Sequence, residues 1–201
     1  MQRYFIEIAY RGTNYKGWQI QRKQPEKPTV QGKIHEAIST FLNKEVEVVG
    51  AGRTDTGVHA IQSFAHFDWE ENLPKEFLKR VNSILPHDIA IKKILPVDAA
   101  AHARFDATER AYEYHIHFKK DPFLYDRSFF FPFGPVDFEK MEAATKLLPT
   151  FKDFKPLSKY NKDNFTTLCE VFEARWEQKP GGLIFHISAN RFLRNMVRRI
   201  V

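Results

Sequence analysis

Hydrophobic and polar residues follow two different periods in the first half of the chain. Between Thr29 and Leu42 the hydrophobic positions recur at spacings of three, four and seven, which is typical of one face of a helix. Thr29 precedes them and is a residue type that caps helix N-termini. Elsewhere apolar and polar residues alternate, as they do in strands. The elements expected, in chain order, are a strand over 5–10, a helix over 30–42, strands over 46–49 and 63–69, a helix over 77–85 that Pro86 stops, and a strand over 89–95 that Pro96 ends.

The same order of elements begins again near Arg110. Tyr112 and Tyr114 alternate with polar residues on a strand, and Asp137 is placed to cap a helix. A Pro-Gly-Gly turn then separates two further runs and indicates a hairpin. The elements expected in this half are a strand over 110–118, a helix over 138–148, hairpin strands over 168–176 and 183–189, and a helix from Asn190 to Val201.

The order of these elements predicts an α+β protein made of two ferredoxin-like halves with mixed or antiparallel sheets. The first half, residues 1–105, is βαββαβ, and the second, residues 106–201, is βαββα. The second half lacks the strand that closes such a sheet, so we expect it to be incomplete and the sequence to be a shortened form of a longer chain. We also expect a basic cleft between the halves.

Charge and cysteine content narrow the class of protein. The chain of 201 residues has 31 Lys and Arg against 25 Asp and Glu, a formal net charge of +6, which suits a polyanionic partner without requiring one. Cys169 is the only cysteine, so an internal disulfide and a cysteine-based zinc site are excluded. The first residues alternate and carry charge, unlike a signal peptide, and no run approaches the ~20 apolar residues of a membrane span. We therefore expect a cytoplasmic protein.

Arginine is concentrated at the end of the chain. On a helix that starts at Asn190, the basic side chains fall on one side and the apolar ones on the other. No Asp or Glu lies between Asn190 and Val201, whereas a solvated charged face normally mixes signs. We therefore expect phosphate or a carboxylate as the counter-charge. The arginines concerned are Arg191, Arg194, Arg198 and Arg199.

A glycine-rich loop over residues 50–60 carries the second candidate. Its glycines let the backbone approach a ligand, and they hold Arg53 and Asp55 two residues apart. Beside arginines, Asp55 would stay ionised at neutral pH, which suits a nucleophile or a base better than an acid. The alternative is a turn in which Asp55 caps local amides. The Asp-Thr-Gly triplet of aspartic proteases also matches here, but such enzymes need two triplets and the chain has one.

The strand that begins at Arg110 presents the third candidate. Tyr112 and Tyr114 share one of its faces, where aromatic rings either fill a core or offer a surface on which a nucleobase stacks. His115 and His117 share the opposite face at a spacing that suits two metal ligands. No third ligand accompanies them, so a metal site is not expected.

These segments together resemble the tRNA pseudouridine synthase A family over nearly the whole chain. The resemblance rests on short motifs that are specific in combination. Family members continue beyond the last of them, which agrees with the missing strand. The motifs are YRGTNYKGWQIQ at 10–21, similar to the N-terminal signature; GRTDTGVHA at 52–60, similar to the catalytic loop; HARF at 102–105 with Arg110, Tyr112 and Tyr114, similar to the second motif; and FL at 192–193 with MVR at 196–198, similar to the third.

The resemblance implies roles for several residues. It makes Asp55 the catalytic aspartate, packs Tyr112 against the target base and pairs Arg198 with Asp55. Arg53 would help to hold the flipped nucleotide and its backbone. The remaining substrate-binding candidates are Tyr114, Arg191 and Arg194.

The resemblance also implies a reaction, in which a homodimer converts uridines 38, 39 and 40 of the tRNA anticodon stem-loop to pseudouridine without a cofactor. The bond from C1′ to N1 breaks, the base turns and C1′ joins C5, so there is no net redox change. The carboxylate would attack C1′ or remove the proton at C2′, and the sequence does not distinguish these routes. A non-catalytic RNA-binding module, in which Asp55 only shapes a loop, is the alternative function.

Overall fold

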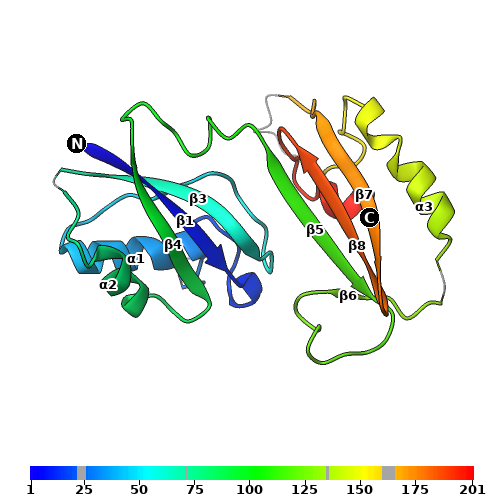
Figure 1. Ribbon diagram of the computed structural model, residues 1–201, viewed down its shortest axis with the longest axis horizontal. Coiled ribbons are helices and arrows are strands. Elements are labelled where there is room, and N and C mark those ends of the chain that lie inside the picture. The colour runs from blue at the N-terminus through cyan, green and yellow to red at the C-terminus, as the bar shows by residue number, and fades with distance from the viewer. Residues whose placement is uncertain (22–25, 71, 135, 160–165) are drawn as a thin grey trace. The chain divides into compact units, whose positions relative to one another are not determined.

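The computed structural model divides the chain into two compact units, Met1–Ala107 and Thr108–Val201 (Figure 1). It describes residues 1–21, 26–70, 72–134, 136–159 and 166–201. Each unit has its own four-stranded sheet and its own hydrophobic core. The predicted α+β class is confirmed. Within the described ranges, no helix is both long enough and apolar enough to cross a membrane.

The first unit has the element order βαββαβ, as its sequence predicted. Its sheet has the order β2-β3-β1-β4, and every neighbouring pair is antiparallel, which is the ferredoxin-like arrangement. Its elements are β1 (Gln2–Tyr10), the 3-10 turn η1 (Gly12–Asn14), α1 (Val30–Leu42), β2 (Val49–Gly50), β3 (Ala60–Trp69), α2 (Phe77–Ile84) and β4 (Ile89–Val97).

Helix α1 begins where its cap predicted. The Thr29 side chain accepts a hydrogen bond from the Gly32 N–H at 3.2 Å, which satisfies one of the free amides of the first turn. The helix lies beside α2 (Figure 1), and both pack with the sheet into one core. The largest fully buried side chains of this core are Phe67, Phe77, Ile6, Ile8, Ile34, Ile38, Val30 and Val48.

Strand β2 is shorter than predicted. Val46 and Val48 are buried but lie outside it, and each has a backbone group bonded to a side chain of α1. The Ser39 hydroxyl accepts from the Val46 N–H at 3.0 Å, and Gln31 Nε2 donates to the Val48 carbonyl at 2.8 Å. Strand β4 in turn continues past Pro96, where it was expected to end. An edge strand tolerates proline because one row of its amides needs no partner.

The second unit repeats this order of strands and adds one short strand. Its sheet has the order β6-β5-β8-β7, with β5, β8 and β7 antiparallel and β6 parallel to β5. The expected helix cap is present, since Asp137 accepts from the Lys140 N–H at 3.1 Å. The elements are β5 (Arg110–His117), β6 (Phe129–Phe130), α3 (Phe138–Thr145), the 3-10 turn η2 (Leu148–Thr150), β7 (Val171–Lys179), β8 (Gly182–Ala189) and α4 (Met196–Ile200).

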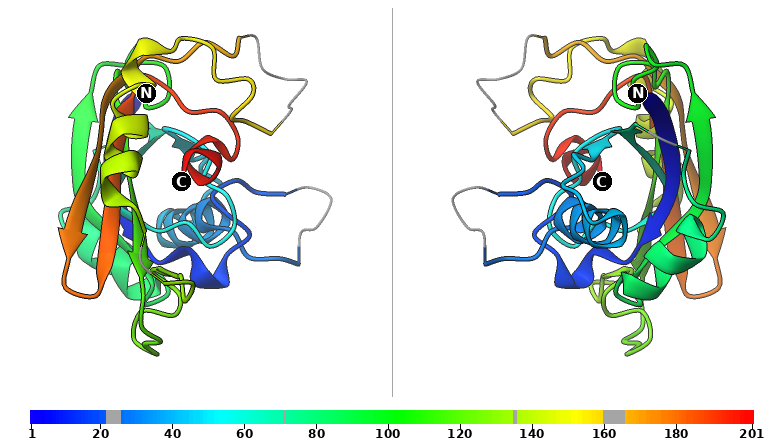
Figure 2. Two further views of the ribbon diagram at one scale, coloured as in Figure 1. Left: turned by 90° about the vertical axis from the view of Figure 1, so that its right-hand side faces the viewer. Right: turned by 90° about the vertical axis from the view of Figure 1, so that its left-hand side faces the viewer.

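The prediction of a helix from Asn190 is wrong. Helix α4, at the red end of the chain in Figure 2, covers only Met196–Ile200. Asn195 has φ 60°, in the left-handed region, which a continuous helix does not contain. The carbonyl of Asn190 accepts from Arg110 Nη1 at 2.9 Å and that of Arg194 from the Lys159 N–H at 2.9 Å. These partners come from other elements, so residues 190–195 form an irregular segment.

Candidate active site

The opening loop of the first unit is bonded to the glycine-rich loop, although they are far apart in sequence. The Trp18 N–H donates to the Thr54 carbonyl at 3.1 Å, and the Tyr10 hydroxyl lies 2.9 Å from the Thr54 hydroxyl. The Gly12 N–H donates to His59 Nδ1 at 3.0 Å. The first two motifs of the sequence therefore form one structure.

Two glycines of the opening loop allow this close approach. A Cβ at Gly12 would lie 2.0 Å from the Val58 carbonyl oxygen, and one at Gly17 would lie 2.3 Å from that of Thr54. Gly17 also has φ 82°, which L-residues rarely adopt. A side chain at either position would push the two loops apart and displace Asp55, which lies between the contacted residues in the sequence.

The opening loop is fastened on its other side to Asp88, just before β4. The Tyr15 hydroxyl donates to one Asp88 carboxylate oxygen at 2.5 Å, and Asn14 Nδ2 donates to the other at 3.1 Å. Burial raises the pKa of Tyr15, and the hydrogen bond to Asp88 raises it further. Tyr15 therefore stays a neutral donor, which keeps the loop in place at physiological pH.

Asp55 lies within the loop that these contacts hold. The residue is half-buried, and its backbone carbonyl accepts from the Val58 N–H at 3.2 Å. Within its own unit, the carboxylate makes no hydrogen bond or ion pair with a described residue, so the local amide cap considered above is not formed. Arg53, on the same loop, is exposed. The loop thus presents one carboxylate and one guanidinium group from a fixed backbone.

In the second unit, the two tyrosines of β5 are half-buried. The Tyr112 ring meets the Phe192 ring edge-on at 5.0 Å, and the Tyr114 ring lies 6.5 Å from that of Phe129. Both tyrosines pack against the edge of the second core and are not enclosed by it. Each therefore combines a fixed position with some accessible aromatic surface.

The predicted arginine face is not formed. Arg191 and Arg194 precede α4, Arg191 half-buried and Arg194 exposed, so they share no helical face with Arg198. Arg198 is exposed on α4. Arg199 Nη1 donates to the carbonyl of Ser158 at 2.8 Å, so this arginine holds a neighbouring turn.

The structure thus assembles the site residues in two groups. Arg53 and Asp55 share a loop of the first unit, whereas Tyr112, Tyr114 and the arginines belong to the second. The pairing of Asp55 with Arg198 joins different units and stays a prediction. The residues that fix the glycine-rich loop had no predicted role. The signal that could have found them was their position inside the two motifs. They are Tyr10, Gly12, Gly17, Thr54 and His59.

The two histidines of β5 have separate partners. His115 Nε2 lies 3.0 Å from a Glu113 carboxylate oxygen, and His117 Nδ1 lies 2.9 Å from the Ser128 hydroxyl. In the part of the chain that the structure describes, no three side chains of the types that bind metals gather in one place.

Comparison with known proteins identifies the family. The chain matches the tRNA pseudouridine synthase family over residues 7–106 and 144–201. It is 49% identical to tRNA pseudouridine synthase A of Parabacteroides distasonis, in an alignment that covers all of this chain and 79% of the relative. The corresponding protein of Azobacteroides pseudotrichonymphae is 48% identical, with 80% of it covered, and that of Caldicellulosiruptor bescii is 36% identical, with 82% covered.

These matches include both motif regions that the geometry brings together in the first unit, and they extend through the third motif at 192–198. The resemblance noted from the motifs is therefore confirmed. The chain belongs to the tRNA pseudouridine synthase family, the isomerases that make pseudouridine in tRNA.

Proposed function

We propose that the chain converts uridine to pseudouridine in tRNA and that Asp55 is its catalytic carboxylate. The observation that carries this proposal is the setting of Asp55. It is half-buried on a loop that the opening loop holds by hydrogen bonds and close glycine contacts, yet its carboxylate has no described partner in its unit. A carboxylate that is positioned but not used structurally is available to react with a substrate.

The isomerisation sets what this carboxylate must do. The bond from C1′ to N1 breaks and one from C1′ to C5 forms, while the proton at C5 leaves and N1 takes one up. Asp55 would attack C1′ as a nucleophile or remove the proton at C2′ as a base, and each role needs the ionised form. Both routes are internal rearrangements of the nucleotide, so neither needs an electron donor or a transferred group.

The remaining roles follow the family resemblance. We propose uridines 38, 39 and 40 of the anticodon stem-loop as targets and a homodimer as the working form in the cytoplasm. Taking a base out of its stack costs a few kcal/mol, which an aromatic surface and basic side chains can offset. Tyr112 and Tyr114 would supply that surface. The basic residues proposed to bind the RNA are Arg53, Arg191, Arg194 and Arg198.

The test is Asp55→Asn, which keeps the shape of the side chain and removes its charge. We expect turnover to fall at least about 100-fold, because the reacting group is lost, while affinity for an unmodified tRNA transcript stays within a few-fold. Turnover is measured as tritium released from tRNA labelled at C5 of uridine. Glu26→Gln, a change at an exposed residue of the same unit, is the matched control and should behave as wild type.

Two results would contradict the proposal. Turnover close to wild type in Asp55→Asn would remove the carboxylate from the chemistry. A parallel collapse of tRNA binding and turnover would make Asp55 a residue that shapes the loop, as in the non-catalytic RNA-binding alternative.

A further inference from the structure

An exposed aromatic ring stands near the end of the first unit, outside the catalytic loop. The Phe105 side chain is 73% exposed, and its ring lies 4.3 Å from the ring of His102 at an angle of 36°. The guanidinium carbon of Arg104 lies 5.6 Å from the centre of the Phe105 ring. We call these three side chains, His102, Arg104 and Phe105, the 102–105 platform. It presents an exposed apolar ring with an imidazole and a guanidinium group beside it.

The backbone beneath the platform is a tightly bonded turn. The N–H groups of Phe105 and Asp106 both donate to the His102 carbonyl, at 3.1 and 3.0 Å. The Asp106 carboxylate accepts from the His102 N–H at 2.7 Å, and the Arg104 N–H donates to His102 Nδ1 at 3.1 Å. The side chains of the platform therefore project from a defined backbone.

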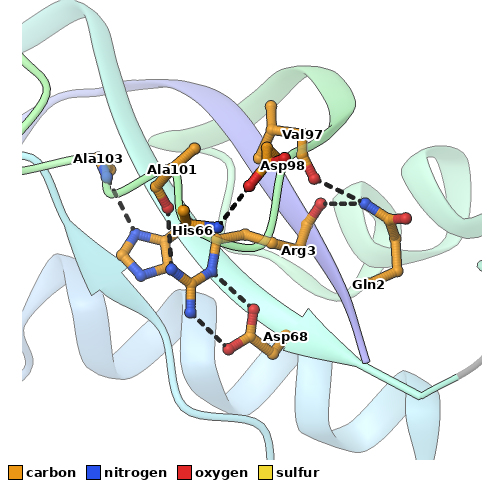
Figure 3. Close-up of polar contacts among 9 residues, drawn as sticks. Gln2, Arg3, His66, Asp68, Val97, Asp98, Ala101 and Ala103 are labelled. Carbon is orange, nitrogen blue, oxygen red and sulfur yellow. Dashed lines mark hydrogen bonds and ion pairs between the residues drawn. The ribbon is translucent and has the colours of Figure 1, made fainter.

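A polar cluster, in which His66 is the buried member, fastens this turn to the sheet (Figure 3). His66, on β3, is 4% exposed, and its Nδ1 accepts from the Ala103 N–H at 3.2 Å. Arg3, on β1, donates from Nη1 to the Ala101 carbonyl at 2.9 Å. The same guanidinium holds Asp68 through two hydrogen bonds of 2.8 Å, so Arg3 itself is fixed. The turn is thus held at two points by side chains from two neighbouring strands.

We propose that the 102–105 platform is a stacking site for an unpaired base of the tRNA substrate, with Arg104 on the adjoining phosphate. The inference rests on the proposed function, since it assumes that tRNA is bound. Aromatic rings and guanidinium planes stack on nucleobases in single-stranded RNA. Because the platform is already ordered, binding would not have to organise it. The excess of basic residues, with a net charge of +6, favours an anionic partner over an acidic or neutral surface.

The test compares two changes at Phe105. Phe105→Leu keeps an apolar side chain but removes the aromatic face, and we expect it to weaken binding of an unmodified tRNA transcript by about 5- to 150-fold, the range measured for loss of one stacked base. KM should rise by a similar factor, with kcat within a few-fold. Phe105→Trp should bind as wild type, and oligouridine of eight nucleotides should quench its added fluorescence, while an RNA duplex of the same length should not.

Phe123→Ala is the matched control, because Phe123 is also strongly exposed, at 80%, and lies in the other unit. Wild-type tRNA affinity in Phe105→Leu, equal to that of Phe123→Ala, would overturn the proposal, as would unchanged fluorescence in Phe105→Trp. A change in solution mass by light scattering in place of a change in tRNA affinity would make the platform a protein contact and would also overturn it. None of these results bears on Asp55→Asn, so failure of the platform and failure of the proposed function are distinguishable.

Discussion

The two units share an order of strands, but only the first pairs its opening strand along both edges. Strand β1 bonds to β3 on one side and to the nine-residue β4 on the other. Strand β5 pairs with β8 along its length, yet its other edge meets only the two-residue β6, at Ile116 and His117. Among the described residues, the rest of that edge has no strand beside it. The order of elements therefore sets which strands are neighbours. The length of the strand on the second edge of the opening strand, nine residues in β4 and two in β6, sets how completely that opening strand is paired.

The hydrophobic cores of the two units also differ, and again the second unit has the smaller set of contacts. In the described part of the chain, 19 residues are buried in the core of the first unit and nine in that of the second, so the second has less apolar surface to hold it together. The helices follow this pattern. Helix α1 buries four residues, whereas α3 buries only Thr145, whose hydroxyl accepts from Trp176 Nε1 at 2.9 Å. We expect the second unit to be the less stable one.

The largest expected effect comes from matched changes in the two cores. Phe67 is 1% exposed in the first unit and Phe185 is 0% exposed in the second. Each change to Ala should lower the free energy of unfolding of its own unit by about 3–5 kcal/mol. We expect Phe185→Ala to unfold the second unit at 25 °C and Phe67→Ala to leave the first unit folded, because the first has more remaining core. Hydrogen exchange followed by mass spectrometry reports each unit separately.

The comparison would fail if either variant lost protection equally in both units. That result would mean that the two cores unfold as one cooperative structure, and the smaller number of buried residues in the second would then carry no separate stability. Equal residual protection in the two mutated units would show instead that the difference in core size is compensated.

The two units also differ in how well the sequence predicted their helices. Helix α1 was predictable because its cap, its apolar period and its packing agree, from Thr29 to Leu42. The segment after Asn190 has an equally regular apolar pattern, but its residues Phe192 and Leu193 pack from an irregular backbone. Arg110 of β5 and the Lys159 N–H donate hydrogen bonds to carbonyls of that backbone. These contacts join residues far apart in sequence, so the local apolar pattern could not predict them.

The candidate site was predictable in its residue types and not in its supports. Glycines around Asp55 indicated close approach, and at Gly50 a Cβ would indeed lie 2.4 Å from the Trp18 ring. The structure adds two glycines of the opening loop, Gly12 and Gly17, which the sequence did not single out. Their contacts with Val58 and Thr54 depend on how β1 and β3 pair, which sets the two loops side by side. A motif therefore indicated the candidate site. The register of the sheet, which single-sequence patterns do not give, brings its two loops together.

A smaller effect on stability is expected on acidification. It tests the turn of the first unit that His66 fastens through the Ala103 N–H. Burial lowers the pKa of His66, and the charges of Arg3 and His102 lower it further, while Asp68 acts in the opposite direction. The unfolded chain binds a proton near pH 6.5 that folded His66 resists, so stability should fall as pH decreases from about 6.5 towards the folded pKa and then level off. Hydrogen exchange of the first unit between pH 8 and pH 5 measures this loss, with the second unit as internal reference.

Two variants separate the charge of His66 from its hydrogen bond. His66→Gln retains an acceptor for the Ala103 N–H and should reduce the acid sensitivity with little change at pH 8. His66→Leu should lower the free energy of unfolding by about 1–3 kcal/mol at pH 8, because it leaves that buried amide without an acceptor. An unchanged pH profile in His66→Gln would assign the acid sensitivity to another group.

The smallest expected effect compares the two helix caps. Thr29→Ala removes the acceptor for the Gly32 N–H at a position that is 4% exposed, and it should lower the stability of the first unit by about 1 kcal/mol. Asp137→Ala removes the corresponding acceptor from α3, but Asp137 is exposed, so water can replace it at the Lys140 N–H and the loss should be smaller. Denaturant unfolding combined with hydrogen exchange measures both. A larger loss for Asp137→Ala would mean that α3 depends on its cap, because it buries only Thr145. The two units would then differ in local helix stability as much as in buried core.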